Sequence, residues 1–215
     1  MVTRLMVKTS DHDSLVPGSS KWRGLRIGLL GGSFNPAHEG HLHVSRQALA
    51  TLELDFVWWL VSPQNPLKDR QELAPFEDRL AGAKLMAGDS KMVVFSPEQS
   101  LGTKFSYDVI VALGETCPHT HFVWLMGADN MVQFPAWRNW RRICEIVPIA
   151  VFDRPGYSLP ALTGEMAQSF AKHRLAAHQA SSLADLDPPV WTFISCQPHP
   201  QSATKIRKGQ TAKAK

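Results

Sequence analysis

Short apolar blocks alternate along most of the chain with longer amphipathic segments. Uninterrupted apolar runs predict buried strands at residues 25–30, 56–63, 92–97, 121–129, 149–155 and 190–195. Apolar residues at helical spacing predict helices at 41–54, 75–89, 106–117 and 137–147. Strands of this kind separated by helices are typical of a parallel sheet covered on both faces. The pattern therefore predicts a single α/β domain.

The pattern weakens in two places. Residues 1–24 are polar and lack periodicity, so we expect a flexible N-terminal extension ahead of an ordered domain at 25–209 and a basic tail at 210–215. Between residues 156 and 190 there is one helical run among Gly, Ser and Pro, which we interpret as an excursion from the sheet. Whether that excursion moves as a lid is left open.

Composition narrows the class of protein. With 215 residues, 44% of them hydrophobic and 20% charged, the chain is typical of a globular domain with one core. There is no signal-peptide pattern and no apolar stretch of membrane-spanning length, so we expect a cytoplasmic protein without a membrane segment. The three cysteines fit no disulfide or metal pattern. The net charge of +4, much of it in the last eleven residues, suits anionic ligands from nucleotides to nucleic acid.

The stretch GGSFNPAHEGHL, residues 31–42, follows the first predicted strand and opens the first predicted helix. Asn35 is expected to cap that helix and Pro36 to occupy its first position. His38 and His41 are three residues apart and lie on one face near the helix N-terminus, which attracts anions. Gly40 lets a ligand approach closely. The stretch therefore predicts a phosphate site with two imidazole donors.

Other motifs with glycine or histidine do not fit this stretch. A zinc-protease helix needs a second histidine four residues after the first, and Leu42 stands there. A P-loop needs a lysine that is absent, and the GxGxxG dinucleotide fingerprint is absent as well. His43 faces elsewhere in this register and is not assigned to the site.

At these residues the sequence resembles the HxGH nucleotidyltransferase superfamily, whose members share a Rossmann-like doubly wound parallel sheet. GGSFNPAHEGHL is most similar to the opening GGTFDPxHxGHL of the bacterial nicotinate mononucleotide adenylyltransferases. The resemblance implies that the ligand at the helix is the triphosphate of ATP. It places in the ATP site the residues Gly31, Gly32, Ser33, Phe34 and Gly40.

Two segments in the middle of the chain resemble further motifs of this family. SPQNPLK ends in Lys68, which by resemblance reaches the phosphates and the substrate, although Leu67 replaces the histidine of the usual PHK. GTKFSYDVI resembles GxRYTxDTL, with Thr103 on a matching position. This resemblance implies that amides at the start of a helix hold the pyridine carboxylate, with substrate-binding residues Ser106, Tyr107 and Asp108.

Two later segments extend the resemblance. LMGADNMVQFPAWRNWRRI resembles GxDxLxxxxxWxxxxxI; it implies ATP-binding roles for Gly127 and Asp129 and stacking of Trp137 on the pyridine, with Trp140 in the core. Asp129 is also a candidate cap of the following helix. QSATKIRKG resembles ISSTxIR, with Ala203 in place of the second serine. Its matching positions at the polyphosphate are Ser202, Thr204, Ile206 and Arg207.

Together the motifs imply transfer of AMP from ATP to nicotinate mononucleotide, a late step of NAD synthesis. His38, His41, Lys68 and Arg207 would be the catalytic residues, because they neutralise charge on the phosphates. Mg²⁺ held by phosphates and water is expected, with no protein-built metal site. The alternatives are an adenylyltransferase for nicotinamide mononucleotide or phosphopantetheine, and a noncatalytic nucleotide- or RNA-binding module. We expect no nucleic-acid partner, and homo-oligomerisation is left open.

Overall fold

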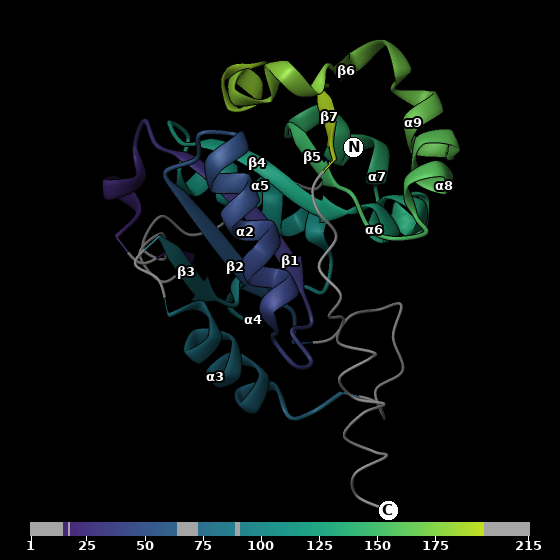
Figure 1. Cartoon of the computed structure of the whole chain (residues 1–215). Helices are drawn as coiled ribbons and strands as arrows, with labels where there is room; N and C mark the ends of the chain where they lie inside the picture. Colours follow the sequence, from purple (N-terminus) through teal and green to yellow (C-terminus); the bar gives the residue numbers. More distant parts are fainter. Residues whose placement is uncertain (1–14, 17, 64–72, 89–90, 196–215) are drawn as a thin grey trace, which may run out of the picture.

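The computed structural model describes residues 15–16, 18–63, 73–88 and 91–195, and at its centre is a seven-stranded sheet (Figure 1). Every neighbouring pair of strands in this sheet is parallel. The strands are β1 (Arg26–Gly32), β2 (Phe56–Val61), β3 (Met92–Phe95), β4 (His121–Gly127), β5 (Ile149–Phe152), β6 (Arg174–Leu175) and β7 (Trp191–Ile194). The predicted parallel α/β sheet is confirmed.

The strand order creates a topological switch point in the sheet. The order is β3-β2-β1-β4-β5-β7-β6, so the chain runs outward from β1 through β2 to β3 and then returns to the other side of β1 with β4. The direction of winding reverses between β1 and β4. In sheets of this type, ligands bind beyond the carboxyl ends of the strands at this switch point. Segments that follow β1 and β4 are therefore the first candidates for a site.

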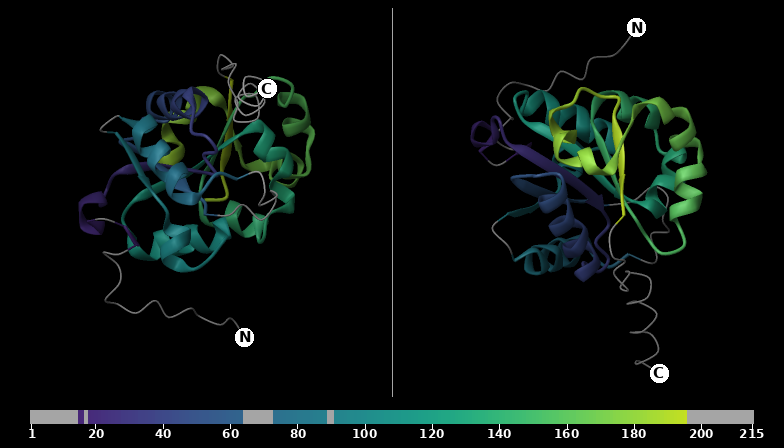
Figure 2. Two further views of the ribbon diagram at one scale, coloured as in Figure 1. Left: turned by 90° about the horizontal axis from the view of Figure 1, so that it is seen from below. Right: turned by 45° about the horizontal axis from the view of Figure 1, so that its top comes forward.

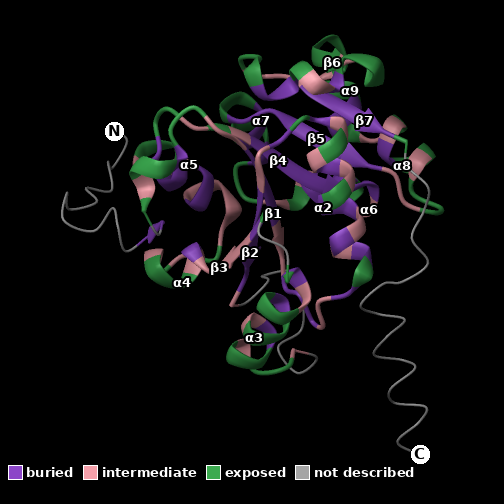
Figure 3. Cartoon of the chain, turned by 60° about the vertical axis from the view of Figure 1, so that its left-hand side comes forward, coloured by how far each residue is buried: buried purple, intermediate pink, exposed green. Residues whose placement is uncertain are grey.

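Helices cover both faces of the sheet (Figures 1 and 2). One core cluster contains side chains from α2 (Glu39–Thr51), α3 (Phe76–Ala87) and the 3-10 helix η5 (Ala177–Asp185). The other contains side chains from η1 (Ser19–Trp22), α5 (Ser106–Thr116), α6 (Ala128–Gln133), α7 (Trp140–Ile146), α8 (Ser158–Thr163) and α9 (Glu165–Ser169). The central strands between them are mostly buried, whereas β3 and β6 at the two sides of the sheet are less so, and the outer faces of the helices are exposed (Figure 3). Burial on both faces explains the uninterrupted apolar runs.

Several predicted boundaries are corrected by the structure. The strand expected to run to Asp129 ends at Gly127, and α6 begins at the next residue. The short η3 (Phe134–Ala136) follows α6. The next helix, α7, begins at Trp140, three residues after the expected start at Trp137. A five-residue helix, α4 (Pro97–Leu101), also follows β3 where no helix was expected. These elements are too short to produce a clear helical period in the sequence.

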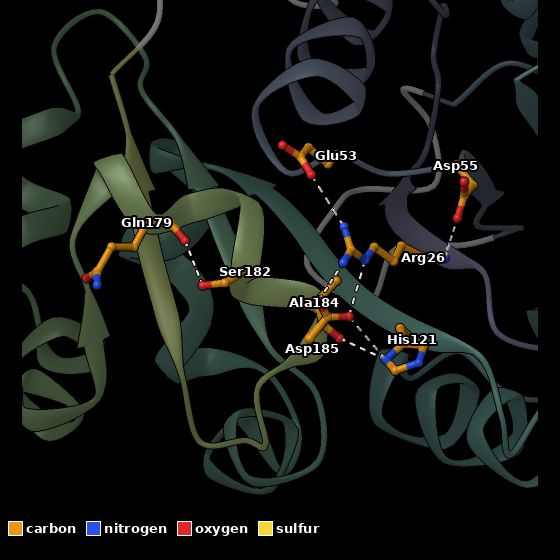
Figure 4. A network of polar contacts seen from close by, with 8 residues as sticks. All are labelled: Arg26, Glu53, Asp55, His121, Gln179, Ser182, Ala184 and Asp185. Carbon is orange, nitrogen blue, oxygen red and sulfur yellow. Dashed lines mark hydrogen bonds and ion pairs between the residues drawn. The ribbon is translucent and has the colours of Figure 1, made fainter.

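Residues 156–190 are folded as part of the domain. They contain α8, α9, η4 (Ala171–His173), β6 and η5, and β6 pairs with β7 at the edge of the sheet. Leu183 of η5 is fully buried. At the end of η5, Asp185 accepts a hydrogen bond of 2.5 Å from Arg26 and lies 3.7 Å from His121 (Figure 4). Arg26 and His121 are the first residues of β1 and β4, so η5 is attached at the amino ends of these strands, away from the carboxyl ends at the switch point.

The packed part of the chain begins earlier than Leu25, the expected start of the domain. Leu15, Val16 and Trp22 are buried in the first core cluster. The Trp22 ring makes edge contacts with Phe56, at 5.1 Å between centroids, and with a tryptophan of β2. Isolated apolar residues in a polar stretch give no periodic signal, which explains the late boundary. Within the described residues, no helix combines the length and apolarity needed to cross a membrane.

Candidate active site

The loop that follows β1 is shaped by packing at both of its ends. Gly31 and Gly32 are the last two residues of β1 itself. A Cβ at Gly31 would lie 2.8 Å from Cη2 of Trp124 on β4, so the neighbouring strand requires glycine there. Phe34 has a φ of 44°, an uncommon conformation for a residue with a side chain, and its ring is buried and stacked 5.0 Å from Trp59. Any contact of Phe34 with ATP would therefore involve its backbone.

His38 and His41 form a capping box at the start of α2. His38, and not Asn35, is the N-cap, and Glu39 is the first helical residue, which corrects the expected roles of Asn35 and Pro36. The N–H of Gly40 donates to Nδ1 of His38 at 3.0 Å. The backbone N–H of His38 donates to Nδ1 of His41 at 3.1 Å. Each imidazole is thereby oriented by a backbone amide.

This capping determines what the two imidazoles offer to a ligand. A ring whose Nδ1 accepts a hydrogen bond has its proton on Nε2, so Nε2 is a donor. The ring centroids of His38 and His41 lie 3.9 Å apart, with an angle of 37° between the ring planes, so the two imidazoles are direct neighbours. The amide of Gly40 already serves the cap, and the amide of His41 donates to the carbonyl of His38. Because these two amides already have acceptors, we expect a ligand at this helix start to be bound mainly by the imidazoles.

The helix that presents these imidazoles is fixed to the sheet by polar contacts as well as by its apolar face. Ser45, one turn after His41, is fully buried and donates to the His41 carbonyl at 2.9 Å. The indole N–H of Trp59 on β2 donates to the Ser45 hydroxyl at 2.8 Å. The His41 ring also lies 4.7 Å from the ring of Phe34. Side chains from β2 and from the preceding loop thus hold the first turn of α2.

A second group of polar residues follows β4 and β5. Asp129 lies in the first turn of α6, and its Oδ1 is 3.3 Å from Nε of Arg154, which follows β5. A Cβ at Gly127 would lie 2.9 Å from that same Nε and closer still to Asp129, so a larger residue there would displace the two side chains from their present contact. Gly127, and not Asp129, is at the cap position of α6, which corrects the expected capping role. Arg154 adds a cation to this edge of the sheet.

The start of α5 lies beside the segment that contains Trp137. Ser106 is the first residue of α5, and Asp108 in the first turn accepts a hydrogen bond of 2.7 Å from the Thr103 hydroxyl. Asp108 also lies 3.6 Å from the guanidinium of Arg138, the residue after Trp137. The first amides of a helix have no acceptor within it and can bind a carboxylate. The structure thus brings together these two segments, 30 residues apart in sequence.

The aromatic residues of this region divide as the sequence suggested. Trp140 is buried in the core and contacts Phe134 at 5.9 Å, so its expected core role is confirmed. Trp137 is only partly buried and makes edge contacts with Trp124 at 6.2 Å and Phe134 at 5.3 Å. Tyr107 on α5 is also partly buried against the core. Trp137 has the exposure that stacking on a ligand requires.

Other predicted site residues lie outside the described residues: Lys68, Ser202, Thr204, Ile206 and Arg207. Sequence reasoning missed two charged residues next to the loop that follows β2. Arg79 is buried on α3, and Glu98 on α4 accepts a hydrogen bond of 2.5 Å from the Ser62 hydroxyl. Burial raises the pKa of Glu98 to about 7, against the opposing effects of Ser62 and Arg79. No motif marks either residue. Glu98 follows β3 closely, which could have suggested it, whereas Arg79 lies within α3 and no local signal distinguishes it.

Fold and site together define the class of protein. A doubly wound parallel sheet with paired imidazoles in HxGH spacing, at the switch point after β1, is a nucleotidyltransferase arrangement. Comparison with known proteins agrees, because residues 29–209 match the model of the cytidylyltransferase-like family.

Two curated relatives narrow the family, and one solved structure shares the fold. A "Probable nicotinate-nucleotide adenylyltransferase" of Parvibaculum lavamentivorans is 50% identical over 185 residues, which are 86% of this chain and 92% of that protein. A protein of the same name from Methylorubrum extorquens is 47% identical, covering 85% and 99% of the two chains. The nicotinic acid mononucleotide adenylyltransferase of Plasmodium falciparum, solved with NaAD, shares the fold with a TM-score of 0.64 at 16% identity, covering 86% and 83%. The chain belongs to the cytidylyltransferase-like family and, within it, to the group named nicotinate-nucleotide adenylyltransferases.

Proposed function

We propose that this chain transfers the adenylyl group of ATP to nicotinate mononucleotide, with nicotinate adenine dinucleotide and pyrophosphate as products. The observation that supports the proposal most directly is the pair of adjacent imidazoles of His38 and His41 at the switch point of the sheet, each oriented by a backbone amide at Nδ1. The names of the curated relatives support the choice of acceptor.

In the proposed reaction, a phosphate oxygen of the mononucleotide forms a bond to the α-phosphorus of ATP. The bond from that phosphorus to the bridging oxygen breaks, and the oxygen leaves with pyrophosphate. The attacking oxygen is already anionic, so no side chain needs to deprotonate it. Catalysis then consists of in-line positioning and of stabilising negative charge on the leaving group. His38 and His41 supply preoriented donors to the phosphates, and Lys68 and Arg207 are proposed as further cations.

The acceptor is proposed to bind between α5 and the segment after η3. The first amides of α5, around Ser106 and Tyr107, would hold the pyridine carboxylate, and the Trp137 ring would stack on the pyridine. Gly127 and Asp129 are proposed to contact the nucleotide where β4 ends. The Asp129–Arg154 contact supports this, because it fixes the carboxylate at the edge of the sheet.

Mg²⁺ is proposed to arrive with ATP, held by phosphate oxygens and water. Within the described residues, no group of three or more ligating side chains is arranged to hold a metal ion. When bound, the ion would neutralise part of the phosphate charge. A cytoplasmic location remains a prediction, and the oligomeric state remains open.

Pyrophosphate release tests the proposal. Wild-type protein is incubated with ATP, Mg²⁺ and, in separate reactions, nicotinate mononucleotide, nicotinamide mononucleotide or phosphopantetheine. We expect release with the first of these far above the others. A preference for the amide or for phosphopantetheine would contradict the proposed acceptor, and no release with any acceptor would support a noncatalytic binding module.

Replacement of His41 by Ala tests the proposed chemistry. We expect turnover to fall by roughly 10²- to 10³-fold, the usual cost of removing a preoriented donor to a developing charge. His43→Ala is the matched control, because it removes an imidazole from the same helix outside the proposed site. Near-normal turnover of the His41→Ala protein would contradict the assignment.

A further inference from the structure

Arg79 occupies an unusual position for an arginine. It is the only Arg, Lys, Asp or Glu among the described residues that is buried, with 4% of its surface exposed. Its neighbours Glu77 and Asp78 on α3 are exposed. Burial lowers the pKa of Arg79, and the charge of Glu98 acts in the opposite direction. A guanidinium stays charged under such conditions, so it needs hydrogen-bond acceptors inside the protein.

Backbone carbonyls from separate segments provide these acceptors. One terminal nitrogen of Arg79 donates to the carbonyl of Ser33 at 2.6 Å and to that of Ser62 at 2.8 Å. The other donates to the carbonyl of Pro63 at 2.7 Å, and Nε donates to the carbonyl of Ala74 at 3.0 Å. Arg79 thus connects the loop after β1, the loop after β2 and the segment that leads into α3.

Further contacts attach the same segments to one another. Oδ1 of Asn35, which is 5% exposed, accepts a hydrogen bond of 3.2 Å from the N–H of Ala74. The N–H of Ser62 donates to the carbonyl of Gly32 at 2.9 Å, next to the Ser33 carbonyl. Glu98 holds the Ser62 hydroxyl from the other side. Ser33 lies five residues before His38, so this network is continuous with the loop that leads to the capping box.

We propose that Arg79 is a positioning residue for nucleotidyl transfer, a role that rests on the proposed function. Its planar guanidinium group fixes the loop after β1 against the end of β2. It thereby sets where His38 and His41 lie relative to the polyphosphate. Lysine has three donors on a single nitrogen and cannot reach acceptors spread over three segments in the same way. Displacement of reacting groups by about 1 Å can cost roughly 10²-fold in rate. The predicted effect is therefore on turnover as well as on stability.

The test compares Arg79→Lys and Arg79→Ala with wild type and with Thr192→Val. Thr192 on β7 is fully buried and donates to the Leu175 carbonyl at 3.1 Å. Its replacement therefore removes a buried hydrogen bond to a carbonyl at a place remote from the loop. Each protein is assayed for kcat and for the KM of both substrates, well below its melting temperature, and for amide hydrogen exchange.

If Arg79 positions the loop, kcat of Arg79→Lys falls by about tenfold or more with small changes in KM, and kcat of Thr192→Val stays at the wild-type value. Guanidinium added at low, nondenaturing concentration raises kcat of Arg79→Ala and leaves wild type unchanged. Exchange in Arg79→Lys accelerates in peptides that cover residues 32–38 and 60–63 more than elsewhere.

A wild-type kcat in the folded Arg79→Lys protein would overturn the proposal. So would an increase in its exchange at residues 32–38 and 60–63 that is no larger than in the rest of the protein. If Arg79→Ala fails to fold, Arg79→Lys decides the question alone. Failure of the proposed function is distinguishable, since wild type would then release no pyrophosphate with nicotinate mononucleotide. The exchange pattern would still show whether Arg79 fixes the loop.

Discussion

His38 combines two roles that substitution can separate. Its Nδ1 caps α2 by accepting from Gly40 at 3.0 Å, and its Nε2 is the proposed donor to a phosphate. Replacement by Asn keeps a side chain that is a strong helix N-cap but removes the imidazole donor. Replacement by Ala removes both. In either variant the backbone N–H at position 38 can still orient His41, because that contact needs no side chain at this position.

The two roles differ in magnitude. Loss of an N-cap costs about 1 kcal/mol of folding free energy. Loss of a preoriented donor to the transition state costs about 3–4 kcal/mol, or roughly 10²- to 10³-fold in kcat. His38→Ala should therefore lose both quantities, whereas His38→Asn should lose turnover and retain most of the stability. The imidazole volume is lost in both variants, so the comparison between them isolates the cap.

Urea unfolding and pyrophosphate release with saturating ATP and nicotinate mononucleotide measure the two effects on the same preparations. A turnover of His38→Asn within about threefold of wild type would refute the donor role. Equal destabilisation in the Asn and Ala variants would refute the capping role. If His38→Asn retains both turnover and stability, the orientation of this imidazole by the capping box has no functional consequence.

Two further predictions concern other parts of the site. Burial raises the pKa of Glu98 from 4.5 to about 7, so the folded protein holds this proton more tightly than the unfolded chain does. The resulting stabilisation is complete below about pH 4.5 and is lost as the pH rises through 7. The difference in unfolding free energy between pH 5 and pH 8, measured with urea, should therefore be smaller in Glu98→Gln than in wild type, by on the order of 2 kcal/mol. The same difference in both proteins would contradict this reasoning. Trp137→Ala should raise the KM for the mononucleotide by about tenfold, the equivalent of a lost stacking contact, with little change for ATP, and Trp137→Phe should lose less. Equal changes in both KM values would contradict a stacking role.

The sheet could be predicted from sequence because its strands are buried on both faces. Such strands need apolar residues at every position, as in the run Phe56–Val61, and this signal does not depend on the rest of the fold. The elements that were missed depend on tertiary contacts. The 3-10 helices η1, η3 and η4 and the strand β6 are short. Trp22 is buried against aromatic side chains of β2, a contact that its own sequence segment does not indicate.

The histidine pair was predictable, but its geometry was not. Spacing placed His38 and His41 on one face near a helix start, and the structure confirms that placement. Sequence favoured Asn35 as the cap because asparagine is a common N-cap residue and histidine is not. The Asn35 side chain instead accepts a hydrogen bond from Ala74, which is 39 residues away and could not be foreseen locally. Long-range contacts therefore decided which residue caps α2.

Several of the contacts that shape this site share a chemical feature: a side chain binds backbone groups of another segment or turn. Imidazoles accept from amides at the start of α2, Asn35 accepts from an amide, and Arg79 donates to backbone carbonyls. Backbone amides and carbonyls are present whatever the side chain of their residue. The shape of the loops therefore depends more on the side chains that bind these backbone groups than on the identity of the residues whose backbone is bound. The same logic supports the proposed positioning role of Arg79, which no motif marks.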